Sequence, residues 1–232
     1  MMKVYTGTSG FSYKEWIGNF YPEKIKPGQM LEYYSSKLGV VEINNTFYRM
    51  PRKEVVENWN RETPDGFLFS IKASRRITHM KRLAAVEEET GYLLENIKSL
   101  GEKLGAVLFQ FPPYFKKHAE RLNDFLAILP SELPAVFEFR DDSWYDDEIS
   151  GILSGRNFIF CFSDMDEKDE PVIINTADWG YLRLRRREYS GDDLKQWATR
   201  IKSQSWKKAL VFFKHEGEGI GPKTAGEFIR LF

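Results

Sequence analysis

In six stretches of this chain a short apolar strand is followed, at or just past its end, by a charged or amide side chain, a residue type able to exchange protons or bind a charged ligand. Buried strands of parallel sheets are usually uninterrupted apolar runs, and a charge inside such a run is costly unless it is paired or solvated. Six interruptions of the same kind therefore predict a shared polar centre where the strand ends converge. The six stretches are Val40–Tyr48, Phe67–Lys72, Val107–Pro113, Val136–Arg140, Ile159–Asp164 and Leu182–Arg185.

Strand geometry predicts which of these side chains meet, because neighbouring residues of a strand face opposite ways. Glu42 shares a face with Asn44, and Glu138 shares one with Arg140. We expect these faces, and that of Arg183 and Arg185, to point into the polar centre. The predicted catalytic groups are Glu42, Lys72 and Glu138, and the predicted substrate-binding residues are Asn44, Tyr48, His79, Gln110, Arg140, Trp144, Asp164, Arg183 and Arg185.

Several kinds of chemistry fit this set of side chains. Two carboxylates and a lysine suit general acid–base catalysis, and a desolvated Lys72 suits Schiff-base formation. Two carboxylates flanking a sugar would suit glycoside hydrolysis. The same charges also suit a structural network in which Lys72, Arg140 and Arg183 neutralise Glu42 and Glu138. The sequence leaves the chemical and the structural interpretation open.

A metal centre is not predicted. The three histidines, His79, His118 and His215, are scattered and show no ligand spacing. The lysine and arginines expected near the carboxylates argue against a bound Mg²⁺. We therefore predict neither a metal nor a cofactor.

The elements that must position these residues alternate between strand and helix along the whole chain. Eight strands alternating with helices indicate a parallel sheet with right-handed crossovers. The simplest closed form is a (β/α)₈ TIM-type barrel of roughly 250 residues, with its active site at the carboxyl ends of the strands. An open doubly wound sheet is the alternative. We predict one domain over residues 1–232, with further strands at Val4–Gly7 and Ala209–Phe213 and helices at Pro27–Leu38, Lys53–Glu62, Val86–Leu104, His118–Leu129, Asp146–Leu153, Gly191–Ser203 and Thr224–Leu231.

Composition limits the partners and the compartment. Lysine plus arginine equals aspartate plus glutamate, 34 against 34, so net charge suggests neither a nucleic-acid nor a membrane partner. The single cysteine, Cys161, rules out an internal disulfide and lies in an apolar run, where we expect it to be buried. We see no signal peptide and no membrane-spanning apolar run, so the expected location is cytoplasmic. Oligomeric state is not indicated.

Two segments outside the strands suggest an anionic ligand. Gly217–Thr224 follows the last strand and precedes a helix, where many barrels bind phosphate; a plain glycine-rich turn fits equally well. Arg75, Arg76, Lys81 and Arg82 could bind a nucleic-acid backbone.

The motifs taken together resemble the DUF72 family, also called YecE-like, over nearly the whole chain. The resemblance implies a TIM-barrel-like fold but no particular reaction. The chain departs from the family pattern after its last two strands, where it carries Arg185–Arg187 and Phe213–Glu216. The motifs that carry the resemblance are Gly7–Tyr13, Phe20–Pro22, Glu42–Tyr48, Lys72–Ser74, Ile77–His79, Leu108–Pro113, Glu138–Arg140, Ser143–Trp144 and Tyr181–Leu184.

Our sequence-based hypothesis is an enzyme that acts on a small phosphorylated or carboxylated substrate. Arg140 and Arg183 would hold the anion, because guanidinium groups match it geometrically. Glu138 or Glu42 would act as base or acid, and Lys72 would stabilise developing negative charge or act as a nucleophile. A nucleic-acid-binding or nucleic-acid-processing protein and a non-catalytic binding module are the alternatives. Trp59 and Trp144 each lie beside an apolar run, and we expect both to be largely buried.

Overall fold

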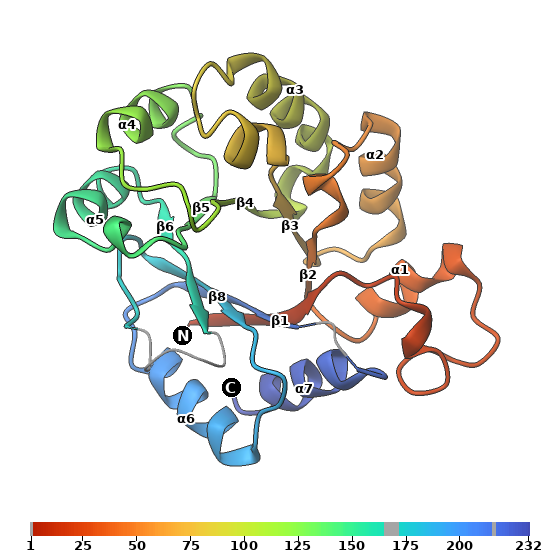
Figure 1. Ribbon diagram of the computed structural model, residues 1–232. Helices are drawn as coiled ribbons and strands as arrows, with labels where there is room; N and C mark the ends of the chain where they lie inside the picture. The colour runs from red at the N-terminus through yellow and green to blue at the C-terminus, as the bar shows by residue number, and fades with distance from the viewer. Residues whose placement is uncertain (1, 165–171, 215–216) are drawn as a thin grey trace.

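The structure is a computed structural model, and it describes residues 2–164, 172–214 and 217–232. The strands lie at the centre of the molecule, and the helices surround them (Figure 1). This arrangement confirms the predicted barrel, with nine strands in place of eight. They are β1 Lys3–Ser9, β2 Val40–Ile43, β3 Leu68–Lys72, β4 Leu104–Gln110, β5 Ala135–Glu138, β6 Ile159–Phe160, β7 Phe162–Asp164, β8 Trp179–Leu184 and β9 Lys208–Phe213.

The sheet runs in the order β6-β5-β4-β3-β2-β1-β9-β8-β7, and every strand pair is parallel. Its two edge strands follow one another in the chain, with only Cys161 between them. The amide of Cys161 still donates to Phe137 O of β5 at 2.8 Å, whereas Phe162 already pairs with Leu182 of β8. One predicted strand is therefore two, because the chain changes its pairing partner at Cys161. This change nearly closes the barrel.

Seven α-helices lie between or after the strands in the described part of the chain. The predicted helix over residues 86–104 is shorter, because Gly101 has a φ of 54° within the 3₁₀ segment Lys98–Lys103. The last helix begins earlier than predicted, directly after Gly219 with its φ of 92°. The helices are α1 Met30–Ser35, α2 Lys53–Glu62, α3 Glu87–Ile97, α4 Ala119–Ala127, α5 Asp147–Ser154, α6 Gly191–Lys202 and α7 Ile220–Ile229.

Some predictions fall on residues outside the described ranges. His215, one of the three histidines considered for a metal site, lies outside these ranges. The longest described helix, α6, has 12 residues. In the part of the chain that the structure describes, no helix has both the length and the apolar character needed to cross a bilayer.

Side-chain alternation divides the strand residues between two apolar clusters. Phe69, Phe109 and Phe137 belong to the larger cluster, which includes the helices, whereas Leu108 and Val136 belong to a smaller one. The smaller cluster contains strand residues of the other parity and fills the inside of the barrel. Its buried members are Val40, Leu68, Ala106, Leu108, Val136, Ile159, Cys161, Trp179, Tyr181, Leu210 and Phe212.

Candidate active site at the barrel mouth

The interior face of the barrel changes from apolar to polar toward the carboxyl ends of the strands. On β2, Glu42 lies two residues after Val40; on β5, Glu138 lies two residues after Val136. The same step of two leads from Tyr181 to Arg183 on β8. Residues two apart on a strand share a face. The predicted inward-pointing charges are therefore on the interior face, at the end where barrel enzymes carry their active sites.

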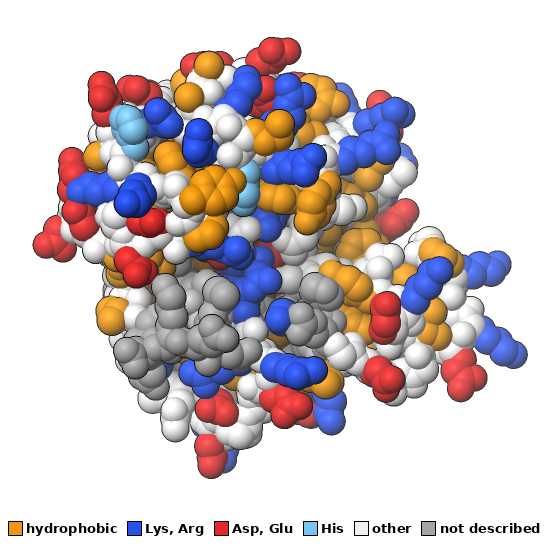
Figure 2. Space-filling view, in the orientation of Figure 1, with side chains coloured by type: hydrophobic (Ala, Val, Ile, Leu, Met, Phe, Trp, Pro, Cys, Tyr) orange, Lys and Arg blue, Asp and Glu red, His pale blue; other side chains and the backbone are white. Residues whose placement is uncertain are grey.

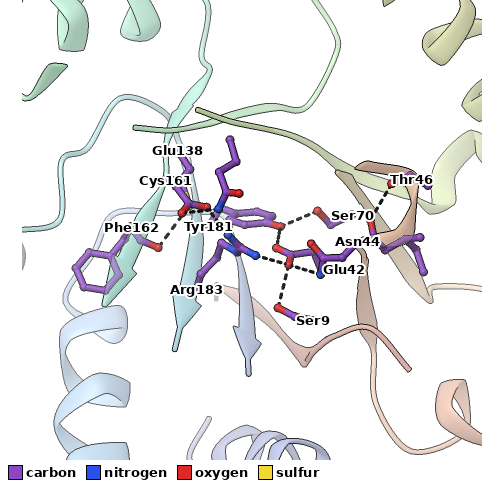
Figure 3. Close-up of polar contacts among 12 residues, drawn as sticks. Ser9, Glu42, Asn44, Thr46, Ser70, Glu138, Cys161, Phe162, Tyr181 and Arg183 are labelled. Atoms are coloured by element: carbon purple, nitrogen blue, oxygen red, sulfur yellow. Dashed lines mark hydrogen bonds and ion pairs between the residues drawn. The ribbon is translucent and has the colours of Figure 1, made fainter. Parts of the chain in front are cut away.

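Arg183 binds both buried glutamates. Its Nη2 donates to Glu42 Oε1 at 2.8 Å, and its Nη1 donates to Glu138 Oε2. All three side chains are almost completely inaccessible to solvent. Figure 3 shows this guanidinium lying between carboxylates that come from two different strands. Arg183 thus connects β8 to β2 and to β5 across the interior.

Neutral donors complete the shell of Glu42 (Figure 3). Its Oε1 also accepts from Ser9 Oγ and from Asn44 Nδ2, each at 2.9 Å. Its Oε2 accepts from the Tyr181 hydroxyl at 2.6 Å, and that hydroxyl lies 2.7 Å from Ser70 Oγ. Every carboxylate oxygen therefore has a partner, as a buried charge requires.

Glu138 has an equivalent shell. Its Oε1 accepts from Gln110 Nε2 at 2.8 Å, and Arg140 Nε lies 3.4 Å from the same oxygen. The Arg140 side chain is 34% exposed, so it reaches from the buried network to the surface of the mouth.

Both carboxyl groups are held ionised. Burial by itself would raise the pKa of Glu42, but the charge of Arg183 and the hydrogen bonds from Tyr181 and Asn44 outweigh it and lower the pKa to about 2. Burial likewise opposes ionisation of Glu138, and the charges of Arg183 and Arg140 lower its pKa to about 2. At neutral pH neither carboxyl group carries a proton to donate.

Lys72 stands apart from this ion-pair network. Its Nζ lies 4.5 Å from the centre of the Phe47 ring, and among the described residues no hydrogen bond or ion pair involves that ammonium group. The Thr46 hydroxyl donates to Lys72 O at 2.7 Å and so links the end of β3 to the segment after β2. Burial and the nearby charge of Arg183 lower the pKa of Lys72 to about 8. This lysine is the mouth residue best suited to exchange a proton near neutral pH.

His79 and Tyr48 form the rim beside Lys72. The His79 ring packs edge-on against Phe47 at 4.8 Å, and its Nδ1 lies 2.9 Å from Thr78 Oγ1. Burial and the charge of Lys72 lower the pKa of His79 to about 4, so its imidazole is neutral at pH 7. Tyr48 is 73% exposed and lines a cavity of about 420 Å³ next to this rim.

The cations of the mouth outnumber its carboxylates. Among the residues that the structure describes, Lys72 and Arg185 each interact electrostatically with Arg183 and Arg140 and with the two glutamates. Burial and the charge of Arg183 lower the pKa of Arg185. Nε of Arg183 and Nη1 of Arg185 are buried, and neither has a hydrogen-bond partner in the described part of the chain. Figure 2 shows lysine and arginine side chains gathered in the hollow at the centre of this face.

Two predicted substrate-binding residues lie away from this cluster. Asp164 has the strand parity of the outward-facing Phe162, and its carboxylate accepts from the amide of Arg185 and from the Tyr189 hydroxyl. Trp144 is completely buried, donates to Phe115 O at 2.6 Å and stacks on Phe139 at 4.4 Å. Its predicted burial is confirmed, whereas Trp59 is only partly buried against Phe69.

Four residues of the site were not singled out from the sequence: Ser9, Phe47, Ser70 and Tyr181. Two of them could have been found from side-chain alternation. Ser70 precedes Lys72 by two residues and Tyr181 precedes Arg183 by two, so each shares a strand face with a predicted site residue. Ser9 and Phe47 give no comparable signal, since only the packed barrel brings them to Glu42 and Lys72.

The glycine-rich segment before α7 leaves little room for an anion. The cavity lined by Arg186, Tyr189, Lys214 and Gly221 has a volume of about 20 Å³, close to the space of one water molecule. A Cβ atom at Gly221 would lie 2.3 Å from Lys214 O, so this glycine serves a close backbone approach. Phosphate binding in this segment remains a prediction.

Fold and site together define a parallel α/β barrel protein whose carboxyl-end mouth holds a buried arginine between two carboxylates. The family model described as "Protein of unknown function DUF72" matches residues 5–232, and the chain belongs to this family. The resemblance predicted from the motifs is thereby confirmed.

Individual relatives agree with this assignment. The UPF0759 protein YunF of Bacillus subtilis (strain 168) is 25% identical over 232 residues, which cover 94% of this chain and 80% of the relative. The UPF0759 protein YecE of Escherichia coli (strain K12) is 28% identical over 139 residues, 60% of this chain and 43% of the relative.

Crystal structures of two DUF72 family proteins have the same fold. The protein from Thermotoga maritima MSB8 superposes with a TM-score of 0.83 and 29% identity, covering 99% of this chain and 98% of the other. The protein from Enterococcus faecalis V583 has a TM-score of 0.79 at 22% identity, covering 100% and 98%. The second similarity concerns the fold alone.

Proposed function

We propose that the barrel mouth binds a small molecule carrying a phosphate or carboxylate group and performs acid–base chemistry on it. One observation carries the proposal: four cationic side chains face two carboxylates, and two buried guanidinium nitrogens have no described partner. A buried donor without a partner is costly, so its presence favours a ligand that accepts the hydrogen bond. An anion would also offset the excess positive charge.

Within this proposal the anion lies against Arg185 and Arg140. The two Nη atoms of Arg183 are already bound to Glu42 and Glu138, which leaves only its Nε for a ligand. Arg185 has a buried Nη1 without a partner among the described residues, and the side chain of Arg140 is 34% exposed. Guanidinium groups bind carboxylate and phosphate with well-defined geometry.

Lys72 is the proposed proton-transfer group. A general acid or base works best when its pKa lies near the working pH. That condition fits Lys72, with a pKa of about 8, and does not fit Glu42 or Glu138, with pKa values of about 2. The two glutamates then hold Arg183 in place and shape the field around the ligand.

Titration calorimetry with inorganic phosphate and with pyruvate tests the proposal. We expect saturable binding of at least one of these probes. Arg185→Met should weaken it by about tenfold to about a hundredfold, because a hydrogen bond to a charged group contributes about 1.5–3 kcal/mol. Arg52→Met is the matched control, since Arg52 is exposed at the start of α2 and lies outside the mouth. Absence of binding, or equal affinity in Arg185→Met, would overturn the proposal.

Nucleic acid is the second candidate ligand, favoured by the exposed Tyr48 and the guanidinium of Arg75, 5.9 Å from its ring centre. Glu89 weighs against it, because it pairs with both Arg76 and Lys81 and neutralises part of the basic segment. Fluorescence anisotropy with a single-stranded oligonucleotide at several salt concentrations separates the candidates. Affinity that falls steeply with salt would favour nucleic acid.

A further inference from the structure

We propose that Lys72 is a nucleophile that forms an imine with an aldehyde or ketone bearing an anionic group, such as a 2-oxo acid. The inference rests on the proposed function, because the same arginines would hold the anionic end of the substrate. It goes further by making Lys72 Nζ the atom that attacks the substrate, in place of a proton-transfer group, and by naming the carbonyl class that it attacks.

The first support is that the carboxylates of the mouth are already fully bound. Glu42 accepts four hydrogen bonds, from Ser9, Asn44, Arg183 and Tyr181. Glu138 accepts from Gln110 and Arg183, with Arg140 alongside. Neither carboxylate pairs with Lys72. A lysine locked in an ion pair would have its lone pair protonated, whereas this amine is left available.

The second support is the surroundings of the amine. Lys72 Nζ lies over the Phe47 ring, and four described charges act on it: Arg183 and Arg140 favour the neutral amine, whereas Glu42 and Glu138 favour the ammonium. Burial and the charge of Arg183 have the larger effect and favour the neutral amine, which is the form that attacks a carbonyl, although the face of the Phe47 ring attracts the ammonium. The lowered pKa of Lys72 has the same physical cause. The backbone of Lys72 is held by the Thr46 hydroxyl, so the amine emerges from a fixed point on the barrel.

The covalent step balances without an oxidant or a reductant. The Nζ lone pair attacks the carbonyl carbon, a C–N bond forms, and the carbonyl π electrons move to oxygen. Proton transfer from nitrogen to oxygen gives a carbinolamine, and loss of one water molecule gives the imine.

Borohydride trapping tests the inference on the full chain. The protein is incubated with pyruvate or glyoxylate, reduced with sodium borohydride and analysed by intact mass spectrometry and peptide mapping. We expect one reduced adduct per chain, located on Lys72. The yield should rise as pH increases toward about 8, because more of the amine is then neutral. Excess inorganic phosphate should suppress trapping by occupying the arginines.

Two variants make the result specific. Lys72→Arg should abolish the adduct while keeping a positive charge in the mouth. Lys208→Arg should leave the adduct unchanged, although Lys208 resembles Lys72 in two respects: its pKa is lowered by burial, and its Nζ lies 4.8 Å from the centre of an aromatic ring, that of Trp179. Lys208 begins β9, so it lies at the opposite end of the barrel, away from the arginines.

The outcomes separate the inference from the proposed function. Phosphate binding without a Lys72 adduct would overturn the imine and leave the anion site standing. Adducts spread over many lysines, or retained in Lys72→Arg, would also overturn it. Failure of both phosphate and pyruvate to bind in calorimetry would overturn the proposed function itself.

Discussion

Arg183 carries one positive charge between two buried carboxylates, which come from β2 and β5. Burial by itself would lower the pKa of Arg183, but the charges of Glu138 and Glu42 outweigh it and raise the pKa well above its ordinary value. The group is therefore charged at any pH at which the protein folds. Three ionised side chains with almost no solvent contact depend on one another, since each compensates the desolvation of the others.

Replacing Arg183 tests this dependence. Arg183→Met should lower the free energy of unfolding by about 3–5 kcal/mol, because it leaves two carboxylates buried without their cation. Urea denaturation provides the measurement. Adding Glu42→Gln and Glu138→Gln to Arg183→Met should recover part of the loss, since the uncompensated charges are then removed. A loss below about 1 kcal/mol in the single variant would show that the network contributes little.

The pKa values of the same carboxylates predict how the stability of the protein depends on pH. Glu42 and Glu138 have folded-state pKa values of about 2, below the ordinary value of 4.5. The unfolded chain therefore binds these protons more tightly, and their stabilising effect is complete above pH 4.5 and lost as the pH falls toward 2. Denaturation midpoints between pH 5 and 2.5 should fall less steeply in Glu42→Gln than in the unmodified protein. Parallel curves would contradict this assignment.

Among the elements, the turn of the chain at Cys161 has the largest consequence for the site. The split between β6 and β7 leaves side-chain parity intact, so Cys161 faces the interior cluster and Phe160 and Phe162 face the helices. Asp164 follows the parity of Phe162 and lies outside the mouth, where it anchors Tyr189 before α6. The final residue of a strand can therefore stabilise the next loop without taking part in the site.

Trp144 packs outside the strands of the same region. Replacing it tests how much this outer packing contributes to the free energy of unfolding. Trp144→Ala should cost about 3–5 kcal/mol of unfolding free energy, as is typical when a fully buried aromatic residue is truncated. Trp59→Ala should cost less, because that side chain is only partly buried beside Phe69. Guanidinium denaturation of both variants shows which replacement causes the larger loss of unfolding free energy. A smaller effect at Trp144 than at Trp59 would contradict the burial assigned here.

At the scale of the whole molecule, the first and last strands of the chain are neighbours within the sheet. β1 pairs with β9 over six residues, from Lys3 with Lys208 to Thr8 with Phe213. The Thr6 hydroxyl on β1 also donates to Ala225 O of α7 at 2.9 Å. Segments from the two ends of the described chain are thus neighbours in space (Figure 1).

This closure predicts that the chain unfolds as one unit. Thermal unfolding followed by far-ultraviolet circular dichroism and by tryptophan fluorescence should give one coincident transition, because strands from the two ends of the described chain pair within one sheet. Two separated transitions would show that the chain contains independently stable parts and would overturn the predicted single domain.

The amino-acid sequence by itself determined the family, the alternation of strands and helices, and most residues of the polar mouth. It could do so because apolar runs and residue parity are local properties: Glu42, Glu138 and Arg183 each end an apolar run on a predictable face. The same alternation predicts that Asp164 faces away from the interior, because it lies two residues after the outward-facing Phe162.

Only the tertiary structure decided which charges pair. Arg183 and Glu42 lie 141 positions apart in the chain, and no local pattern shows that their strands face one another across the barrel. The neutral groups Ser9, Ser70 and Tyr181 likewise reach this network only when the strands pack into the barrel. By satisfying both carboxylates, these contacts leave Lys72 without an anionic partner among the described residues. The availability of that amine is a property of the folded barrel, because it depends on every other contact in the mouth.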